Sequence, residues 1–302
     1  MNKQEIPGGD RVEASPSKRR GLLAGAGMGA LAVGALAASG GAMLSSSPAQ
    51  AQAITDPDIF NFALNLEYLE AEYYLRGVTG QGLADAHTTG TGTRGGVTGG
   101  SAVPFRSSYL QQYMTKIAVD EQAHVKFIRA VLGASAVARP AINFSDAFNN
   151  LAIAGGLIVP GQSFNPFADE VSFLLGAFVF EDVGVTAYGG AANLINDRTL
   201  VAYAASVLAV EAYHAGAVRA LIANIGGGEA ADKIATLRAR LSGRGDEQPI
   251  RLPNNNYNFA PTDQQAQTFR RTPRQVLNIV YGAPNAPGGL FFPAGVNGTI
   301  RS

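Results

Sequence analysis

The chain has 302 residues with 23 basic and 23 acidic side chains, and its 15% of charged residues is well below the roughly 25% of an average soluble domain. A net charge of zero gives no electrostatic reason to expect a nucleic-acid partner. The absence of cysteine excludes disulfides, thiolate nucleophiles, zinc fingers and iron–sulfur clusters. Acids and the three histidines are therefore conspicuous wherever they interrupt an apolar segment.

Residues 1–53 have the pattern of an export signal. A polar lead ends in Arg19 and Arg20, and the 24 residues that follow carry no charge. Two overlapping Ala-x-Ala sites predict cleavage after Ala51 or Ala53. The arginine pair and the weakly hydrophobic Ala/Gly core resemble a twin-arginine signal, which implies a periplasmic or secreted protein. An uncleaved membrane anchor is the alternative, but so much glycine and alanine would insert weakly.

Helix start signals and apolar periodicity predict four long helices between residues 54 and 225. Thr55-Asp56-Pro57 predicts the start of the first helix, which is expected to end near Gly77. We expect the second helix over 106–132. The third is expected to begin at the similar signal Asn165-Pro166, and the fourth to cover 198–225.

The connections are predicted from their Gly, Thr and Pro content. A Gly/Thr-rich insertion, 77–104, separates the first two helices, and a long crossover with a short helix at 145–154 joins the halves. Residues 226–302 form a predicted C-terminal extension with short helices at 230–241 and 273–281. No segment shows sustained strand alternation, so we expect an all-α fold.

Residues 54–225 contain two copies of one pattern. In the first and third helices a glutamate precedes a tyrosine by seven positions, and in the second and fourth a glutamate precedes a histidine by three. The matched pairs are Glu67 with Tyr74, Glu181 with Tyr188, Glu121 with His124, and Glu211 with His214. Two duplicated hairpins joined by a crossover predict a four-helix bundle about a pseudo-twofold axis.

The acids and histidines of these helices lie where isolated charge is costly. Apart from tyrosines, the ionisable residues within 171–185 and 200–225 are Glu181, Asp182, Glu211, His214 and Arg219. Positions three apart share a helix face, so each Glu-x-x-His pair can bind one ion, although an ordinary surface pair is the alternative. Because unpaired buried carboxylates are unstable, and two divalent cations balance four of them, the sequence predicts a dinuclear metal centre.

The pattern resembles the ferritin-like di-iron and di-manganese carboxylate proteins, in which two helices supply one Glu each and two supply Glu-x-x-His. The resemblance covers 56–225, and segments 271–277 and 289–293 resemble the branch of desiccation-related proteins. It implies a ferritin-like four-helix bundle with a C-terminal wrap and two Fe or two Mn ions per chain. The implied ligands are Glu67, Glu121, His124, Glu181, Glu211 and His214. Asp120 is implied as the hydrogen-bond partner of a ligand imidazole, whereas Val210 occupies the matching place in the fourth helix.

Other residues have alternative interpretations. Glu70 lies one turn beyond Glu67 and could replace it as a ligand, but its duplicate position is Gly184, so the symmetry favours Glu67. Tyr74 and Tyr188 are either core residues or hydrogen-bonding or redox partners of the centre. The same alternatives, weighted toward the core, apply to Tyr113 and Tyr203. Glu72 and Glu170 are expected to be solvated or helix-start charges. His87 is expected to be exposed and to have no part in the centre. Arg129 and Arg219 are either counter-ions of the centre or packing residues at the helix ends.

We predict that the centre reacts with hydrogen peroxide or dioxygen, in catalase-, peroxidase- or ferroxidase-like chemistry. The alternative is a non-enzymatic envelope protein that protects during desiccation and uses the metal structurally. The insertion, the crossover and the C-terminal extension argue against a storage cage, while a smaller homo-oligomer is compatible with the sequence. No nucleic-acid partner is expected, and no membrane partner once the signal is cleaved.

Overall fold

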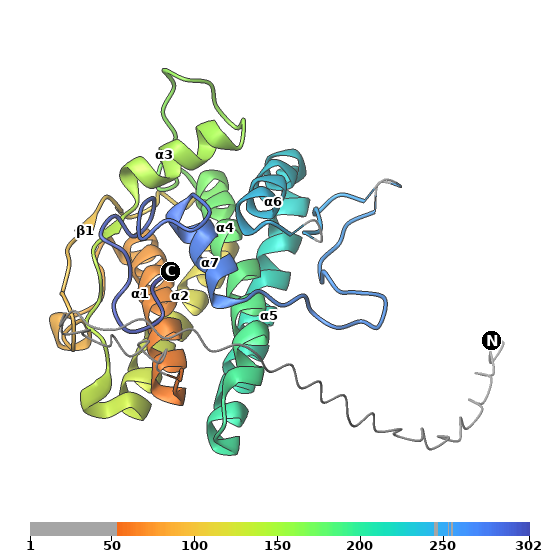
Figure 1. Ribbon diagram of the computed structural model, residues 1–302. Coiled ribbons are helices and arrows are strands. Elements are labelled where there is room, and N and C mark those ends of the chain that lie inside the picture. Colours follow the sequence, from red (N-terminus) through yellow and green to blue (C-terminus); the bar gives the residue numbers. More distant parts are fainter. Residues whose placement is uncertain (1–52, 245–246, 253, 255) are drawn as a thin grey trace, which may run out of the picture. The chain divides into compact units, whose positions relative to one another are not determined.

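The computed structural model describes residues 53–244, 247–252, 254 and 256–302. Of the predicted export signal, only Ala53 is among these residues, and the rest lies outside the described part of the chain. Seven α-helices are present in this part of the chain, with only two strands of two residues each, so the predicted all-α fold is confirmed. The four long helices are α1 (Asp56–Thr79), α2 (Ser108–Leu132), α4 (Glu170–Ala191) and α5 (Arg198–Asn224). Helix α1 packs along α2 and α4 packs along α5, as the duplicated hairpins require (Figure 1).

Side chains that cap the helices explain where they begin. Thr55 accepts a hydrogen bond from the backbone of Asp58, whose carboxylate returns to Thr55, and Pro57 fits the first turn. Helix α5 begins after Asp197, which accepts from two backbone amides. The chain leaves α1 through Gly80, whose φ of 75° lies in the left-handed region that favours glycine.

The predicted start of the third long helix was wrong. Asn165 caps only an isolated turn, and α4 begins after Asp169, which accepts from the backbone of Ser172 at 2.8 Å. The two start signals lie four residues apart, and both satisfy free backbone amides locally. Glu170 does lie in the first turn of α4, where its carboxylate accepts from the backbone amides of Arg106 and Ser107. This contact joins the starts of α2 and α4.

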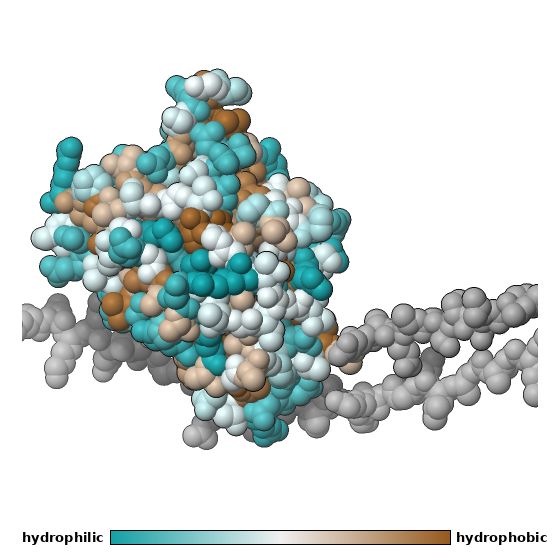
Figure 2. All heavy atoms as spheres, turned by 90° about the vertical axis from the view of Figure 1, so that its left-hand side faces the viewer, coloured by the Kyte–Doolittle hydropathy of each residue, from teal (hydrophilic) through white to brown (hydrophobic). Residues whose placement is uncertain are grey.

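The connections between the long helices are ordered by short elements. The insertion contains η1 (Asp85–His87) and β1 (Val97–Thr98), and the crossover contains η2 (Gly133–Ser135), β2 (Ile142–Asn143) and α3 (Ser145–Ala154). Strands β1 and β2 pair in parallel, with Val97 opposite Ile142. The insertion is thus hydrogen-bonded to the crossover. Figure 2, which faces the side of the molecule where β1 lies, shows polar and hydrophobic residues mixed there without a broad hydrophobic patch.

Helix α4 is the centre of the fold, since α1, α5 and two C-terminal helices pack against it. These are α6 (Gly228–Ser242) and α7 (Pro273–Tyr281), while η3 (Ala192–Leu194) follows α4 directly. Among the described helices, α4 and α5 are long and apolar enough to cross a membrane, a test that core helices of soluble proteins also pass. Because α4 is 89% buried over this window, its hydrophobicity is that of a core helix.

Candidate metal centre

The six predicted ligand side chains come together in the middle of the bundle. Glu67 is on α1, Glu121 and His124 on α2, Glu181 on α4, and Glu211 and His214 on α5. All six residues are buried, and the four glutamates are at most 1% exposed. The side chains of His124 and His214 are 10% and 7% exposed, so solvent reaches the cluster at the imidazoles of α2 and α5.

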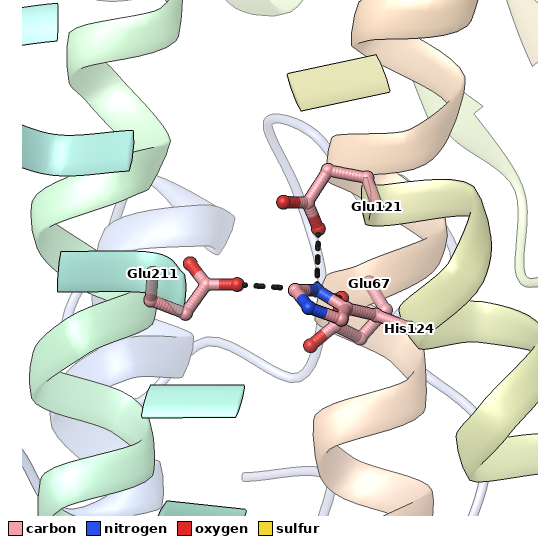
Figure 3. Close-up of side chains that lie close together, drawn as sticks. All are labelled: Glu67, Glu121, His124 and Glu211. Atoms are coloured by element: carbon pink, nitrogen blue, oxygen red, sulfur yellow. Dashed lines mark hydrogen bonds and ion pairs between the residues drawn. The ribbon is translucent and has the colours of Figure 1, made fainter. Parts of the chain in front are cut away.

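The first group of potential ligands surrounds the His124 ring. Its Nδ1 atom lies 3.2 Å from Glu67 Oε2, 3.2 Å from Glu121 Oε2 and 3.5 Å from Glu211 Oε1. Figure 3 shows these three carboxylates turned toward the imidazole from their separate helices. Four donor atoms lie within 4.8 Å of one another, which is close enough to hold one ion.

The second group surrounds His214. Its Nδ1 atom lies 2.9 Å from Glu121 Oε1 and 3.6 Å from Glu181 Oε2. Glu121 therefore belongs to both groups, with one oxygen toward each imidazole. The centroids of the two rings are 6.3 Å apart. A carboxylate shared between two three- or four-donor groups is an arrangement that could bridge two ions.

Unsatisfied polar atoms indicate that this cluster lacks a partner. Buried atoms without a hydrogen bond within the described residues include Glu67 Oε2, Glu121 Oε1, Glu181 Oε2, both Glu211 oxygens and His214 Nδ1. Buried polar atoms are almost always paired, so a concentration of such atoms at one point is exceptional. Carboxylate and imidazole donors suit Fe and Mn. The residues present therefore fit a bound metal.

Two tyrosines hold the outer oxygens of two glutamates. Tyr74 on α1 donates to Glu181 Oε1 on α4, and Tyr188 on α4 donates to Glu67 Oε1 on α1. The exchange crosses between the two hairpins and follows the predicted pseudo-twofold relation. Each tyrosine leaves the second oxygen of its glutamate directed toward an imidazole.

Asp120 lies at the exposed edge of the centre. Its Oδ2 atom is 3.1 Å from His214 Nε2, and its other oxygen accepts from Lys116. With Nε2–H donating to Asp120, Nδ1 of His214 faces Glu121 and Glu181, and it could coordinate an ion there once its proton is released. Val210 offers no equivalent acceptor to His124, so the two imidazoles are held differently.

Burial and mutual repulsion shift the protonation of the cluster when no metal is bound. Burial raises the pKa of Glu67 to about 7, and it also raises the pKa of Glu181 and Glu211. Burial acts in the same direction on Glu121, but its close contacts with both histidines outweigh burial and hold the pKa of Glu121 below its ordinary value. Surrounding carboxylates overcome the effect of burial on the histidines and raise the pKa of His124 to about 12 and of His214 to about 11.

Several other sequence-based expectations are corrected here. Tyr113 and Tyr203 are 37% and 38% exposed, so they are not core residues. Glu72 was expected to be solvated but is fully buried, because the crossover brings Arg139 onto it and Arg76 pairs with it one turn away. No local pattern could reveal the partner, which is 67 positions distant in sequence.

The remaining candidates lie outside the two ligand groups. His87 was expected to be exposed, but it is half-buried on η1. Arg129 donates to the Tyr68 hydroxyl and to a loop carbonyl, which is a packing role. Arg219 is buried and pairs with Asp182, not with the glutamates. Three residues that were not among the sequence-based candidates complete this second buried cluster: Arg238, Glu247 and Arg271.

Comparisons with known proteins agree with this architecture. Residues 55–224 match the Ferritin-like domain family. The chain is 30% identical over 268 residues to the ferritin-like catalase Nec2 of Nesocodon mauritianus, covering 81% of this chain and 84% of that protein. It is 27% identical over 273 residues to the desiccation-related protein PCC13-62 of Craterostigma plantagineum, covering 82% and 85%. No solved structure gives a significant match. Together with the bundle and its central Glu/His cluster, the match over residues 55–224 shows that the chain belongs to the ferritin-like domain family.

Proposed function

We propose that the protein is an exported metalloprotein with two Fe or two Mn ions per chain, and that it reacts with hydrogen peroxide or dioxygen. The unsatisfied carboxylate and imidazole atoms of the buried cluster are the observation that carries this proposal. The first group (Glu67, Glu121, His124 and Glu211) would hold one ion, and the second group (Glu121, Glu181 and His214) the other. The metal pair would supply the change of oxidation state that these oxidants require.

The residues around the two groups are suited to hold the ligands in place. Tyr74 and Tyr188 restrict the two terminal glutamates, and Asp120 fixes the ring of His214. A pre-organised set of donors avoids the cost of ordering them during the reaction. The glutamates are at most 1% exposed and the two imidazoles only slightly exposed, so a small oxidant such as peroxide or dioxygen is a better fit to the centre than a large substrate.

Peroxide turnover tests the proposal directly. Protein stripped by a chelator and reloaded separately with Mn or Fe should evolve oxygen from hydrogen peroxide, or oxidise Fe(II) in air. The double variant His124→Ala, His214→Ala should lose this activity, whereas His87→Ala, which changes the histidine outside the cluster, should keep it. Elemental analysis of protein purified from its natural source without added metal would identify the ion. Equal activity in the double variant would refute the assignment.

A second function is supported by the similarity to a desiccation-related protein. In that case the metal would only stabilise the folded protein, and the protein would protect other molecules of the cell envelope during drying without turning over an oxidant. Metal-loaded protein that binds two ions, melts at a higher temperature than the stripped form and neither evolves oxygen nor oxidises Fe(II) would support this function over the first.

Export through the twin-arginine route belongs to the same proposal. The variant with Arg19→Lys and Arg20→Lys should remain in the cytoplasm as the uncleaved precursor, because the arginine pair is the distinguishing part of that signal. Cell fractionation with immunoblotting measures this. Normal periplasmic accumulation of the double variant would exclude the twin-arginine route.

A further inference from the structure

Glu70 is a buried carboxylate that the two ligand groups do not use. It lies one helical turn beyond Glu67 on the same face of α1 and is 5% exposed. Among the described residues, no side chain or backbone group forms a hydrogen bond or ion pair with it. Burial and the negative charges of Glu121, Glu67 and Glu181 raise the pKa of Glu70, and the smaller attraction of His124 does not offset them. An acid in this position is unstable unless something outside the chain's own residues compensates it.

Gly184 leaves the space through which Glu70 approaches the cluster. A Cβ atom at Gly184 would lie 2.2 Å from Glu211 Oε2 and 3.4 Å from Glu70 Oε1. Both oxygens therefore border the same point, and Glu211 Oε2 is itself unsatisfied. Gly184 is the position that duplicates Glu70 in the second hairpin. The first hairpin thus contributes an additional carboxylate, Glu70, and the absence of a side chain at Gly184 in the second hairpin leaves space beside it.

Water does not offer Glu70 a good alternative partner. A hollow of about 10 Å³ borders it between α1, α4 and α7, and Glu70 is the only polar side chain in its lining. A cavity of this size holds one water at most, and a buried water needs two to four polar partners. The carboxylate is therefore left to the Glu/His cluster.

We propose that Glu70 is an additional carboxylate ligand of the ion held by the first group, and that it makes the two metal positions unequal. This inference rests on the proposed dinuclear centre. The first group has four donor residues and the second has three, and Glu70 lies just outside both. If its carboxylate turns toward the first position when an ion binds, that position gains a fifth donor. The extra anionic oxygen increases the affinity of the first position for a divalent cation.

The proposal is tested by anaerobic isothermal titration calorimetry, in which Mn²⁺ is added to the stripped mature chain. The unmodified chain should bind two ions in two resolved steps. Glu70→Gln should weaken the tighter step by about tenfold or more and leave the other step unchanged, a loss in the range seen when groups that support a metal site are removed. Glu72→Gln is the matched control, because Glu72 is equally buried on α1 but pairs with Arg139 and Arg76. It should leave both steps unchanged.

Stability of the stripped protein provides a second readout. Glu70→Gln removes a repelled charge and should raise the melting temperature at pH 8, whereas Glu72→Gln leaves Arg139 unpaired and should lower it. Glu70→Asp keeps the charge but withdraws the carboxylate, so it should also weaken the tighter step if direct ligation is required.

The outcomes separate this inference from the function on which it rests. Superimposable titrations of the unmodified chain and Glu70→Gln, with two ions bound in both, would overturn the role of Glu70 alone. Full affinity in Glu70→Asp with loss in Glu70→Gln would show a distant counter-charge and overturn ligation. An unmodified chain that binds neither Mn²⁺ nor Fe²⁺ would refute the dinuclear centre itself.

Discussion

Two buried charge clusters begin at neighbouring residues of α4, and they are built in opposite ways. Asp182 accepts from Arg219 at 2.9 and 2.8 Å and from Arg238 at 2.7 Å, and Glu247 joins Arg238 to Arg271. Every acid oxygen in this arginine cluster has a donor. Glu181 belongs instead to a cluster that contains two histidines and no arginine, where several oxygens have none.

The difference shows that burial of charge alone does not mark a functional site. Arginine keeps its charge at any physiological pH, and its planar guanidinium can donate to both oxygens of a carboxylate at once. Such a carboxylate stays paired at every physiological pH. The arginine cluster therefore ties α6 and the C-terminal extension to α4, and it leaves no acid oxygen free to bind a cation. Histidine can give up its proton, so a Glu/His cluster can exchange protons for metal. The following predictions test this contrast.

Loss of the histidines should have the largest effect. His124→Ala and His214→Ala each remove one terminal donor from a different ligand group, so each variant should fall from about two ions per chain toward one. The double variant should retain almost no metal. Inductively coupled plasma analysis after gel filtration measures this, with His87→Ala as the control that keeps two ions. Unchanged stoichiometry in both single variants would contradict the site.

Breaking the arginine cluster should cost stability without removing metal. Asp182→Ala leaves the buried guanidinium of Arg219 without its acid and that of Arg238 with Glu247 alone, so the free energy of unfolding should fall by about 3–5 kcal/mol. Glu181→Ala on the neighbouring residue removes a carboxylate whose burial is costly, so it should destabilise the stripped protein less than Asp182→Ala does, but it should reduce metal binding. Guanidinium chloride titrations and metal analysis of both variants test the pair. If Asp182→Ala lost its metal while still folded, the two clusters would not be independent.

The pH dependence of stability should change sign when metal is removed. In the stripped protein the pKa of Glu67 is raised to about 7, above its unfolded value, so its contribution is present at acid pH and lost as pH rises through 7. The raised pKa values of His124 and His214, about 12 and 11, make stability fall above the unfolded value near 6.5. Each proton held only by the folded state contributes a slope of about 1.4 kcal/mol per pH unit.

Metal reverses this slope, because protons compete with it for carboxylate and imidazole. Thermal melts from pH 5 to 8 should show the stripped protein losing stability as pH rises and the loaded protein losing it as pH falls. The lowered pKa of Glu121 acts only at more acid pH and does not enter this range. Parallel slopes in the two forms would mean that the glutamates are independently paired.

The smallest expected effects come from the tyrosines. Tyr74→Phe and Tyr188→Phe each remove one hydrogen bond to a buried carboxylate, which should lower the free energy of unfolding of the loaded protein by about 1.5–3 kcal/mol. The two losses should be similar, because the tyrosines occupy equivalent places in the two hairpins. Tyr203→Phe, at an exposed hydroxyl, is the control and should change little. A large difference between Tyr74→Phe and Tyr188→Phe would show that the halves are not equivalent in energy.

Local signals and duplication allowed the sequence to predict much of this protein. The helical period, the caps at Thr55 and Asp197 and the repeated Glu-x-x-His spacing act over a few residues, so the long helices and the six clustered side chains follow from them. Where two caps competed, at Asn165 and Asp169, the prediction chose the wrong one. Both signals satisfy free backbone amides locally, so the local pattern could not show which of them begins α4.

Only the tertiary structure decided which buried acids were paired and which were not. Glu72 meets Arg139 across 67 positions, and Asp182 meets Arg238 across 56, while Glu70 and the four glutamates of the cluster meet no arginine. Sequence periodicity can place a residue on the inward face of a helix, but it carries no information about which distant side chain faces it. The pKa of a buried carboxylate depends on its distance from that partner and on its loss of contact with water. Both the distance and the burial are set only when the helices pack.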